Sequence, residues 1–191
     1  MQLPDRQGSH GAELLQLARD SIGYGFVHKK PLPVDCGELP AELTEVRATF
    51  TSLHLAGKLR GCCGTLEASR PLAEDVAYSA FQAAFRDTRF GPLGKHELAS
   101  ISLEVSVLSP METMSVTDEA DLLSQLKPGT DGLVVIDGWR RATFLPKVWD
   151  ALPEPEQFLT QLRLKCGLPA NYWSERLEFL RYRTSTYAEA A

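Results

Sequence analysis

The amino-acid sequence predicts an α+β fold: a single compact domain, residues 1–191, built from two α-β-β-α-β repeats around one barrel-like, mainly antiparallel sheet. Three observations predict it. Some segments carry apolar residues at helical spacing, and others alternate apolar and polar residues. The same order of helical and extended segments occurs twice along the chain. The composition, with 43% hydrophobic and 24% charged residues, is that of a chain that folds around a core.

The first predicted repeat covers about residues 11–110 and contains five elements. They are a helix at 12–22, the two strands of a hairpin at 46–55 and 58–65, a helix that begins at 71 and ends before 91, and a strand at 101–107. Gly23 and Gly25 are expected to end the first helix, and Gly57 is expected in the hairpin turn. Residues 28–40, with three prolines, are expected to form a loop.

The second predicted repeat covers about residues 117–188 and has the same order of elements. They are a helix at 120–126, hairpin strands at 133–137 and 140–145, a helix at 155–166, and a strand at 177–187. Gly138 takes the place in this hairpin that Gly57 has in the first. The pattern therefore indicates a structural duplication.

Charge and composition exclude several classes of function. The formal net charge of −5 disfavours binding to a nucleic-acid backbone, which requires a positive surface. We see no secretory signal at the start and no run of about 18 apolar residues, so we expect a cytoplasmic protein without a membrane span. The four cysteines and four histidines show no ligand spacing, so no metal or cofactor is expected.

The segment 59–64, Leu-Arg-Gly-Cys-Cys-Gly, is the predicted functional spot. If it is an extended strand, Arg60 and Cys62 share one face while Leu59 and Cys63 share the other. Leu59 marks the apolar face, so Cys63 is expected to fill the core. Cys62 then lies beside a guanidinium, which favours a reactive thiolate.

The glycines on either side of the cysteine pair have two interpretations. Gly61 and Gly64 remove bulk from the strand and let a ligand or another backbone come close, which makes them candidate binding residues. Alternatively they mark a β-bulge, Arg60 is a solvated charge, and both cysteines only pack. The sequence leaves both interpretations open.

The second repeat offers a counterpart to Arg60 and Cys62. Counted from the hairpin glycines, Arg141 corresponds to Arg60 and Thr143 to Cys62. If the repeats are related by an approximate two-fold axis, both pairs could face a common cleft, and two guanidiniums suit a carboxylate or a phosphate. The alternative is that these arginines are ordinary charges on an edge strand.

Three further residues could join the site. Glu104 is the charged residue on the polar face of its strand and could act as a general base or arginine partner, or it could simply face solvent. Asp87 and Arg89 follow a predicted helix. They are expected to brace the loop through an ion pair, with ligand contact as the alternative role.

Five motifs resemble a known family, in the same order along the chain. They are Leu-Arg-Gly-Cys-Cys-Gly at 59–64, Arg-Asp-Thr-Arg-Phe at 86–90, Glu-Val-Ser-Val-Leu-Ser-Pro at 104–110, Arg-Ala-Thr-Phe-Leu-Pro-Lys-Val-Trp at 141–149 and Lys-Cys-Gly-Leu-Pro at 165–169. Together they are similar to the AMMECR domain, also called AmmeMemoRadiSam system protein A. The sequence departs from the family pattern at Cys63, where a bulky aliphatic residue is usual.

The resemblance implies an α+β domain with two β3α2 repeats around one barrel-like sheet. It implies no particular reaction, and it suggests Memo-like and radical-SAM proteins as partners. The sequence does not decide whether the chain is an enzyme. Our first hypothesis is an enzyme-like component that binds a small anionic substrate, with Cys62 as nucleophile or carrier and Glu104 assisting. The alternative is a non-enzymatic binding module that docks on such a partner.

Overall fold

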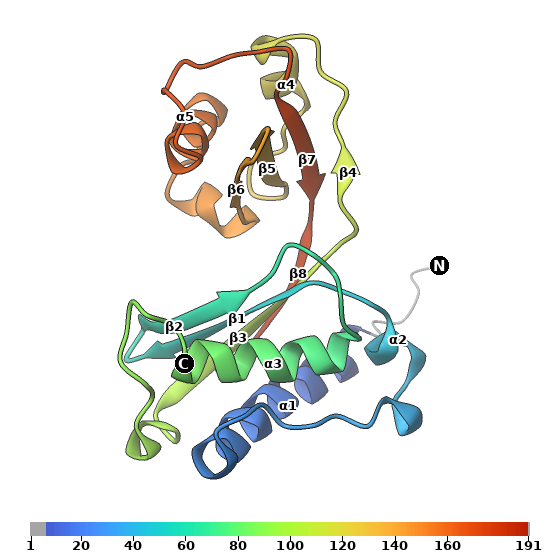
Figure 1. Cartoon of the computed structure of the whole chain (residues 1–191), viewed down its shortest axis with the longest axis vertical. Helices are drawn as coiled ribbons and strands as arrows, with labels where there is room; N and C mark the ends of the chain where they lie inside the picture. The colour runs from blue at the N-terminus through green and yellow to red at the C-terminus, as the bar shows by residue number, and fades with distance from the viewer. Residues whose placement is uncertain (1–6, 191) are drawn as a thin grey trace. The chain divides into compact units, whose positions relative to one another are not determined.

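A computed structural model describes residues 7–190 of the chain (Figure 1). The chain divides into two compact units. The first runs up to Leu108 and takes up the chain again at Ser185, and the second spans Ser109–Thr184. Each unit is described by itself, and the prediction that the whole chain is a single domain stays a prediction.

The first unit consists of a four-stranded antiparallel sheet with two long helices on one face (Figure 1). The strand order is β2-β1-β3-β8. The elements are α1 (Gln7–His28), η1 (Cys36–Glu38), α2 (Ala41–Thr44), β1 (Thr49–Leu55), β2 (Lys58–Gly64), α3 (Leu72–Phe85), η2 (Lys95–Glu97), β3 (Ile101–Leu108) and β8 (Thr184–Ala188).

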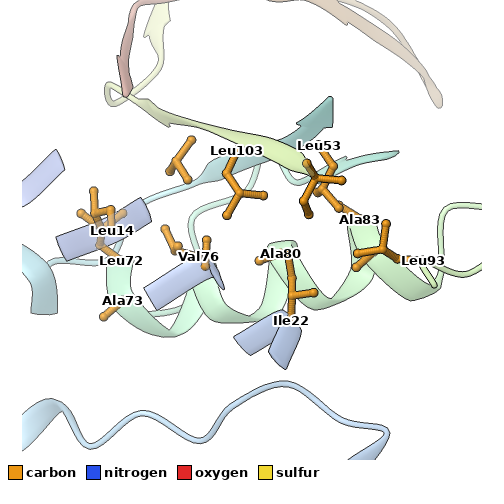
Figure 2. Packing of buried hydrophobic residues seen from close by; sticks show 14 of the residues in the cluster. Leu14, Ile22, Leu53, Leu72, Ala73, Val76, Ala80, Ala83, Leu93 and Leu103 are labelled. Atoms are coloured by element: carbon orange, nitrogen blue, oxygen red, sulfur yellow. The ribbon is translucent and has the colours of Figure 1, made fainter. Parts of the chain in front are cut away.

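The core of the first unit lies between the sheet and the pair α1 and α3. Leu53 of β1 and Leu103 of β3 point down to the helices, where they meet Val76 and Ala80 of α3 and Ile22 of α1 (Figure 2). All five are at most 1% exposed. Small side chains along α3 let the two helices and the sheet approach closely, so burial of this apolar face holds the unit together.

The second unit repeats this plan on a smaller scale. Its sheet has the order β4-β7-β5-β6, and its core gathers around Phe158, whose ring stacks on Trp149 with centroids 3.8 Å apart. The elements are β4 (Glu112–Thr113), α4 (Glu119–Gln125), β5 (Gly132–Asp137), β6 (Arg140–Phe144), η3 (Pro146–Asp150), α5 (Pro155–Lys165) and β7 (Glu178–Tyr182).

The strand orders confirm the predicted repeat of elements. In each unit a hairpin, β1-β2 or β5-β6, is followed by a helix and then by a third strand, β3 or β7, that pairs with the first strand of the hairpin. The fourth strand comes from the other half of the chain: β4 follows β3 but joins the second sheet, and β8 follows β7 but joins the first.

The α+β class and the antiparallel pairing are confirmed, while the predicted barrel-like sheet is not closed. The strands form two four-stranded sheets, with β2 and β8 at the edges of one and β4 and β6 at the edges of the other. Within residues 7–190, no helix is long and apolar enough to cross a membrane.

Several element boundaries differ from the sequence-based prediction, and two of the differences have a structural reason. The first helix does not end at Gly23 and Gly25 but continues to His28. A Cβ on Gly25 would lie 2.6 Å from Cε2 of Phe85, so this glycine serves the close packing of α1 on α3 and does not stop the helix. The last predicted strand, 177–187, is divided into β7 and β8, which belong to different sheets.

Candidate functional site

The segment 59–64 forms β2, an edge strand, and it carries a β-bulge. His54 of β1 pairs with Leu59 and the next residue, Leu53, pairs with Gly61, so Arg60 is the extra residue. The bulge interrupts the simple alternation by which we placed Arg60 and Cys62 on one face. Leu59 is 42% exposed, so it does not mark the apolar face as predicted.

Arg60 turns to the loop that follows α3. Its Nε and Nη2 donate to the two carboxylate oxygens of Glu97 at 2.8 and 3.0 Å. Nη1 donates to the carbonyl of Gly91 at 2.9 Å, and Nη2 also donates to that of Pro92 at 3.3 Å. The hydrogen bonds from Arg60 are the main cause that lowers the pKa of Glu97 to about 2, with a backbone bond from Gly94 adding to them. Arg60 is therefore a clamp on this loop, and four of its five N–H donors are used.

The same loop holds both backbone groups of Cys62. The N–H of Cys62 donates to Oδ2 of Asp87 at 2.9 Å, and Nη2 of Arg89 donates to the Cys62 carbonyl at 3.4 Å. The predicted ion pair of Asp87 and Arg89 is present, with Nη2 and Oδ2 2.8 Å apart. Hydrogen bonds from the Arg89 side chain, above all, hold the pKa of Asp87 well below its usual range. An edge strand exposes its backbone groups, and here the loop covers them at Cys62.

The two cysteines lie on opposite faces of the sheet, as predicted. Cys63 pairs with the buried Thr51 and packs against the core of the first unit, where burial raises the pKa of its thiol. Cys62 pairs with Ser52, and Ser52 pairs in turn with Glu104 of β3. Cys62, Ser52 and Glu104 therefore form one row across three strands on the face away from α3.

Spacing within this row limits its chemistry. Side chains opposite each other on paired strands have Cβ atoms roughly 5 Å apart. Cys62 and Glu104 lie two strands apart, at roughly 10 Å, so Ser52 stands between them. Sequence reasoning missed Ser52 and Glu97. Ser52 lies within the strand predicted at 46–55, but its register against Cys62 depends on the bulge.

The two glycines make room for the protein's own backbone. A Cβ on Gly61 would lie 2.3 Å from the carbonyl oxygen of Ala83 in α3, and one on Gly64 would lie 2.3 Å from that of Thr49. Both contacts are far shorter than a side chain tolerates, so the predicted close approach of another backbone is observed at both glycines, and the predicted β-bulge is also present, beside Gly61.

The predicted counterparts lie in the second unit. Thr143 pairs with Val134 at the fourth position of its hairpin, the position that Cys62 has in the first. Its hydroxyl donates to the carbonyl of Leu133 at 2.9 Å and lies 2.8 Å from the hydroxyl of Tyr182. Arg141 pairs regularly with Ile136 and is exposed, whereas Arg60 is a bulge residue. The common cleft for both arginines stays a prediction.

Comparison with known proteins identifies the family. A model of the AMMECR1 family matches residues 15–187, which is most of the chain. The chain belongs to the AMMECR1 family. The resemblance seen in the five sequence motifs is thereby confirmed.

Relatives of this AMMECR1-family chain match it over most of its length. A protein of Methanothermobacter thermautotrophicus is 35% identical and covers 94% of both chains. A protein of Thermotoga maritima is 37% identical over 78% of this chain and 82% of its own. The crystal structure of an uncharacterized protein from Pyrococcus horikoshii is similar with a TM-score of 0.86 and 30% identity, and covers 94% of this chain and 91% of its own.

Among the described residues of this AMMECR1-family chain, no three His, Cys, Asp or Glu side chains come together as a metal site. Cys63 lies against the core of the first unit. Its position therefore fits a packing role.

Proposed function

We propose that this chain handles a small anionic substrate on the open face of the first sheet, with Cys62 as nucleophile or transient covalent carrier. The observation that carries the proposal is the setting of Cys62. Asp87 and Arg89 hold its backbone on both sides, and its side chain lies in a row with Ser52 and Glu104. A cysteine that only fills space, such as Cys63, needs neither arrangement.

The clamp supports a reacting role because a nucleophile works best when its position is fixed before the substrate arrives. β2 is an edge strand, and an edge residue without partners moves more freely. Asp87 removes this freedom at Cys62, and Arg60 with Glu97 holds the loop that carries Asp87. Arg60 is thus a positioning residue in this proposal.

The row suggests how a proton leaves the thiol. Cys62 gives its proton to the hydroxyl of Ser52, and Ser52 passes its own proton to the carboxylate of Glu104. The thiolate sulfur then adds to a carbonyl carbon of the substrate and forms the S–C bond, while the C=O π bond breaks and its electron pair moves to the oxygen, which takes the proton held by Glu104. Arg89, whose side chain is 59% exposed, offers its remaining N–H donors to the substrate anion.

The experiment compares two alkylating reagents of similar size, iodoacetate and iodoacetamide, under native conditions. If Arg89 attracts anions to Cys62, iodoacetate reacts faster at Cys62, relative to iodoacetamide, than it does at Cys36. Arg89→Ala should remove this preference and Arg89→Lys should keep most of it. An equal ratio at both cysteines, or a ratio that Arg89→Ala leaves unchanged, would contradict the proposal.

A second function, docking on a protein partner, is supported by Trp139. This side chain is 89% exposed at the tip of the β5-β6 hairpin, with the guanidinium of Arg140 5.3 Å from its ring. Tryptophan and arginine are enriched among residues that dominate protein interfaces. We propose a cytoplasmic Memo-like or radical-SAM protein as the partner. Trp139→Ala should weaken its binding at least as much as Arg60→Ala does, while Cys62→Ala leaves binding unchanged. The opposite result would favour the first function.

A further inference from the structure

A pocket of about 210 Å³ lies in the first unit, where the ends of α1 and α3 meet. It is lined by Gly25, Lys29, Phe81, Phe85, Arg86 and Pro92. None of these residues belongs to the row of Cys62, and none of them is acidic.

The floor of the pocket is aromatic. The rings of Phe81 and Phe85 have centroids 5.1 Å apart and are tilted by 46°. Gly25 lets these rings reach the backbone of α1, since a Cβ there would lie 2.6 Å from Phe85 and 2.7 Å from Phe81. The pocket therefore offers an apolar ring surface at its base.

Two cations flank this floor. Lys29 and Arg86 are both exposed, and neither side chain has an ion pair or hydrogen bond within the described part of the chain. Each follows the last residue of a helix, where a positive charge also suits the helix dipole. The helix dipole explains why both side chains are positively charged, but it does not explain why a pocket lies between them. Lys29 has φ of +58°, a backbone conformation that glycine usually adopts at a helix end. Ending the helix therefore does not require a long basic side chain at this position.

The volume and the lining define the ligand. An apolar cavity of about 150 Å³ holds benzene. At about 210 Å³, this pocket accommodates one such ring and a small substituent. Phenylalanine rings favour an aromatic ligand body, and two cations with no carboxylate among the lining residues favour an anionic substituent.

We infer that this pocket is a binding site for a small aryl anion, a single aromatic ring with a carboxylate or phosphate group, separate from the row of Cys62. The ring lies on Phe81 and Phe85, and the anionic group lies between Lys29 and Arg86. Pro92 also lines the pocket, and its carbonyl accepts a hydrogen bond from Nη2 of Arg60 at 3.3 Å.

The test is a titration of the full chain with benzoate and phenyl phosphate, followed by NMR signals of the phenylalanine rings and by calorimetry. Benzyl alcohol is the neutral control and benzylamine the cationic one. We expect saturable binding of at least one anion, with shifts at Phe81 and Phe85, and binding of both controls weaker by about tenfold. The preferred anion distinguishes carboxylate from phosphate ligands.

Variants locate the site. The double change Lys29→Ala with Arg86→Ala should weaken anion binding by about tenfold without loss of folding, since both side chains are exposed. Lys58→Ala, an exposed cation outside the pocket, and Cys62→Ala should leave it unchanged. Absence of saturable binding by both anions, equal binding of the neutral control, or equal affinity in the double variant would each overturn the inference.

Discussion

The two units share a plan but differ where side chains meet on their sheets. At the fourth hairpin position, the first unit has the row Cys62, Ser52 and Glu104. The second unit has Thr143, Val134 and Leu180 in the same places. The first row carries a thiol, a hydroxyl and a carboxylate, while the second is apolar apart from Thr143. One scaffold thus carries a polar row in one unit and a largely apolar row in the other.

The helix that follows each hairpin, α3 or α5, also has a polar residue in the first unit where the second unit has an apolar one. The fourth residue of α3 is Asp75, which is 1% exposed and accepts from the N–H and hydroxyl of Thr49 at 3.0 and 2.7 Å. The fourth residue of α5 is Phe158, which is fully buried and stacks on Trp149. Polar bonds thus anchor α3 to its sheet, whereas α5 is anchored by aromatic contacts of Phe158 with Trp149 of η3 and Phe144 of β6.

The largest effect is expected at the aromatic anchor. Phe158→Ala removes a fully buried ring and leaves a cavity, so it should lower the free energy of unfolding by about 3–5 kcal/mol. Urea denaturation followed by far-UV circular dichroism measures this. Trp139→Ala, at an 89% exposed ring, should change stability by less than about 0.5 kcal/mol. Equal effects of the two changes would show that Phe158 does not anchor the helix.

The polar anchor should come next. Asp75→Ala leaves the N–H and hydroxyl of Thr49 without their acceptor, so we expect a loss of about 2–3 kcal/mol in the same assay. Asp75→Asn keeps one acceptor oxygen and should lose less. If Asp75→Ala left the free energy of unfolding unchanged, the distinction between the two anchors would be lost.

The bulged hairpin β1-β2 has a glycine at a position where the regular hairpin β5-β6 has an alanine, and exchanging the two residue types compares the hairpins. Gly61 and Ala142 both hold the third hairpin position, and a Cβ on Gly61 would lie 2.3 Å from the carbonyl oxygen of Ala83 in α3. Gly61→Ala should therefore lower stability by about 2 kcal/mol through overpacking. The reverse change, Ala142→Gly, should cost about 0.5–1 kcal/mol through chain entropy. The order of the two losses is the result to measure, and the opposite order would contradict the close approach of α3 to β2.

The smallest effect concerns pH. Hydrogen bonds from Arg60 lower the pKa of Glu97 from 4.5 to about 2 in the folded chain. A carboxylate with a lowered pKa stabilises the fold above its unfolded value, and this contribution disappears as the pH falls through the folded value. Stability of the parent relative to Glu97→Gln should therefore decline between pH 4.5 and about 2. A difference that stays constant over this range would show that the clamp is absent in solution.

Much of the fold could be predicted from the sequence because its patterns are local. The alternation around Val105 predicts β3, and the apolar spacing around Val76 predicts α3. Gly25 was misread as a helix end because its reason lies in Phe81 and Phe85, far along the chain. The membership of β8 in the first sheet was also missed, since strand pairing is a long-range property that no local pattern reveals.

Part of the candidate site could also be predicted, because some of its features depend only on residues that are close in sequence. Cys62 and Cys63 separate onto two faces by local alternation, and Asp87 with Arg89 form their pair within three residues. The bulge at Arg60 depends on the approach of α3, so its partner Glu97 could not be found from spacing. Counting from the turn glycines did give Thr143 and Cys62 equivalent positions in the two hairpins. Gly57 is the second residue of its turn and Gly138 is the first, and the extra bulge residue in the first hairpin compensates for this difference.

The comparison of the two hairpins can be tested most directly by one measurement: rates of alkylation by iodoacetamide in the native chain, resolved by mass spectrometry. Thr143→Cys adds a thiol at the matching position of the second unit, beside Val134 and Leu180. Our account predicts that Cys62 reacts faster than Cys63, Cys166 and this added thiol. If Cys62 reacts no faster than Cys63, or if the added thiol reacts as fast as Cys62, the row with Ser52 and Glu104 does not make Cys62 the reactive residue.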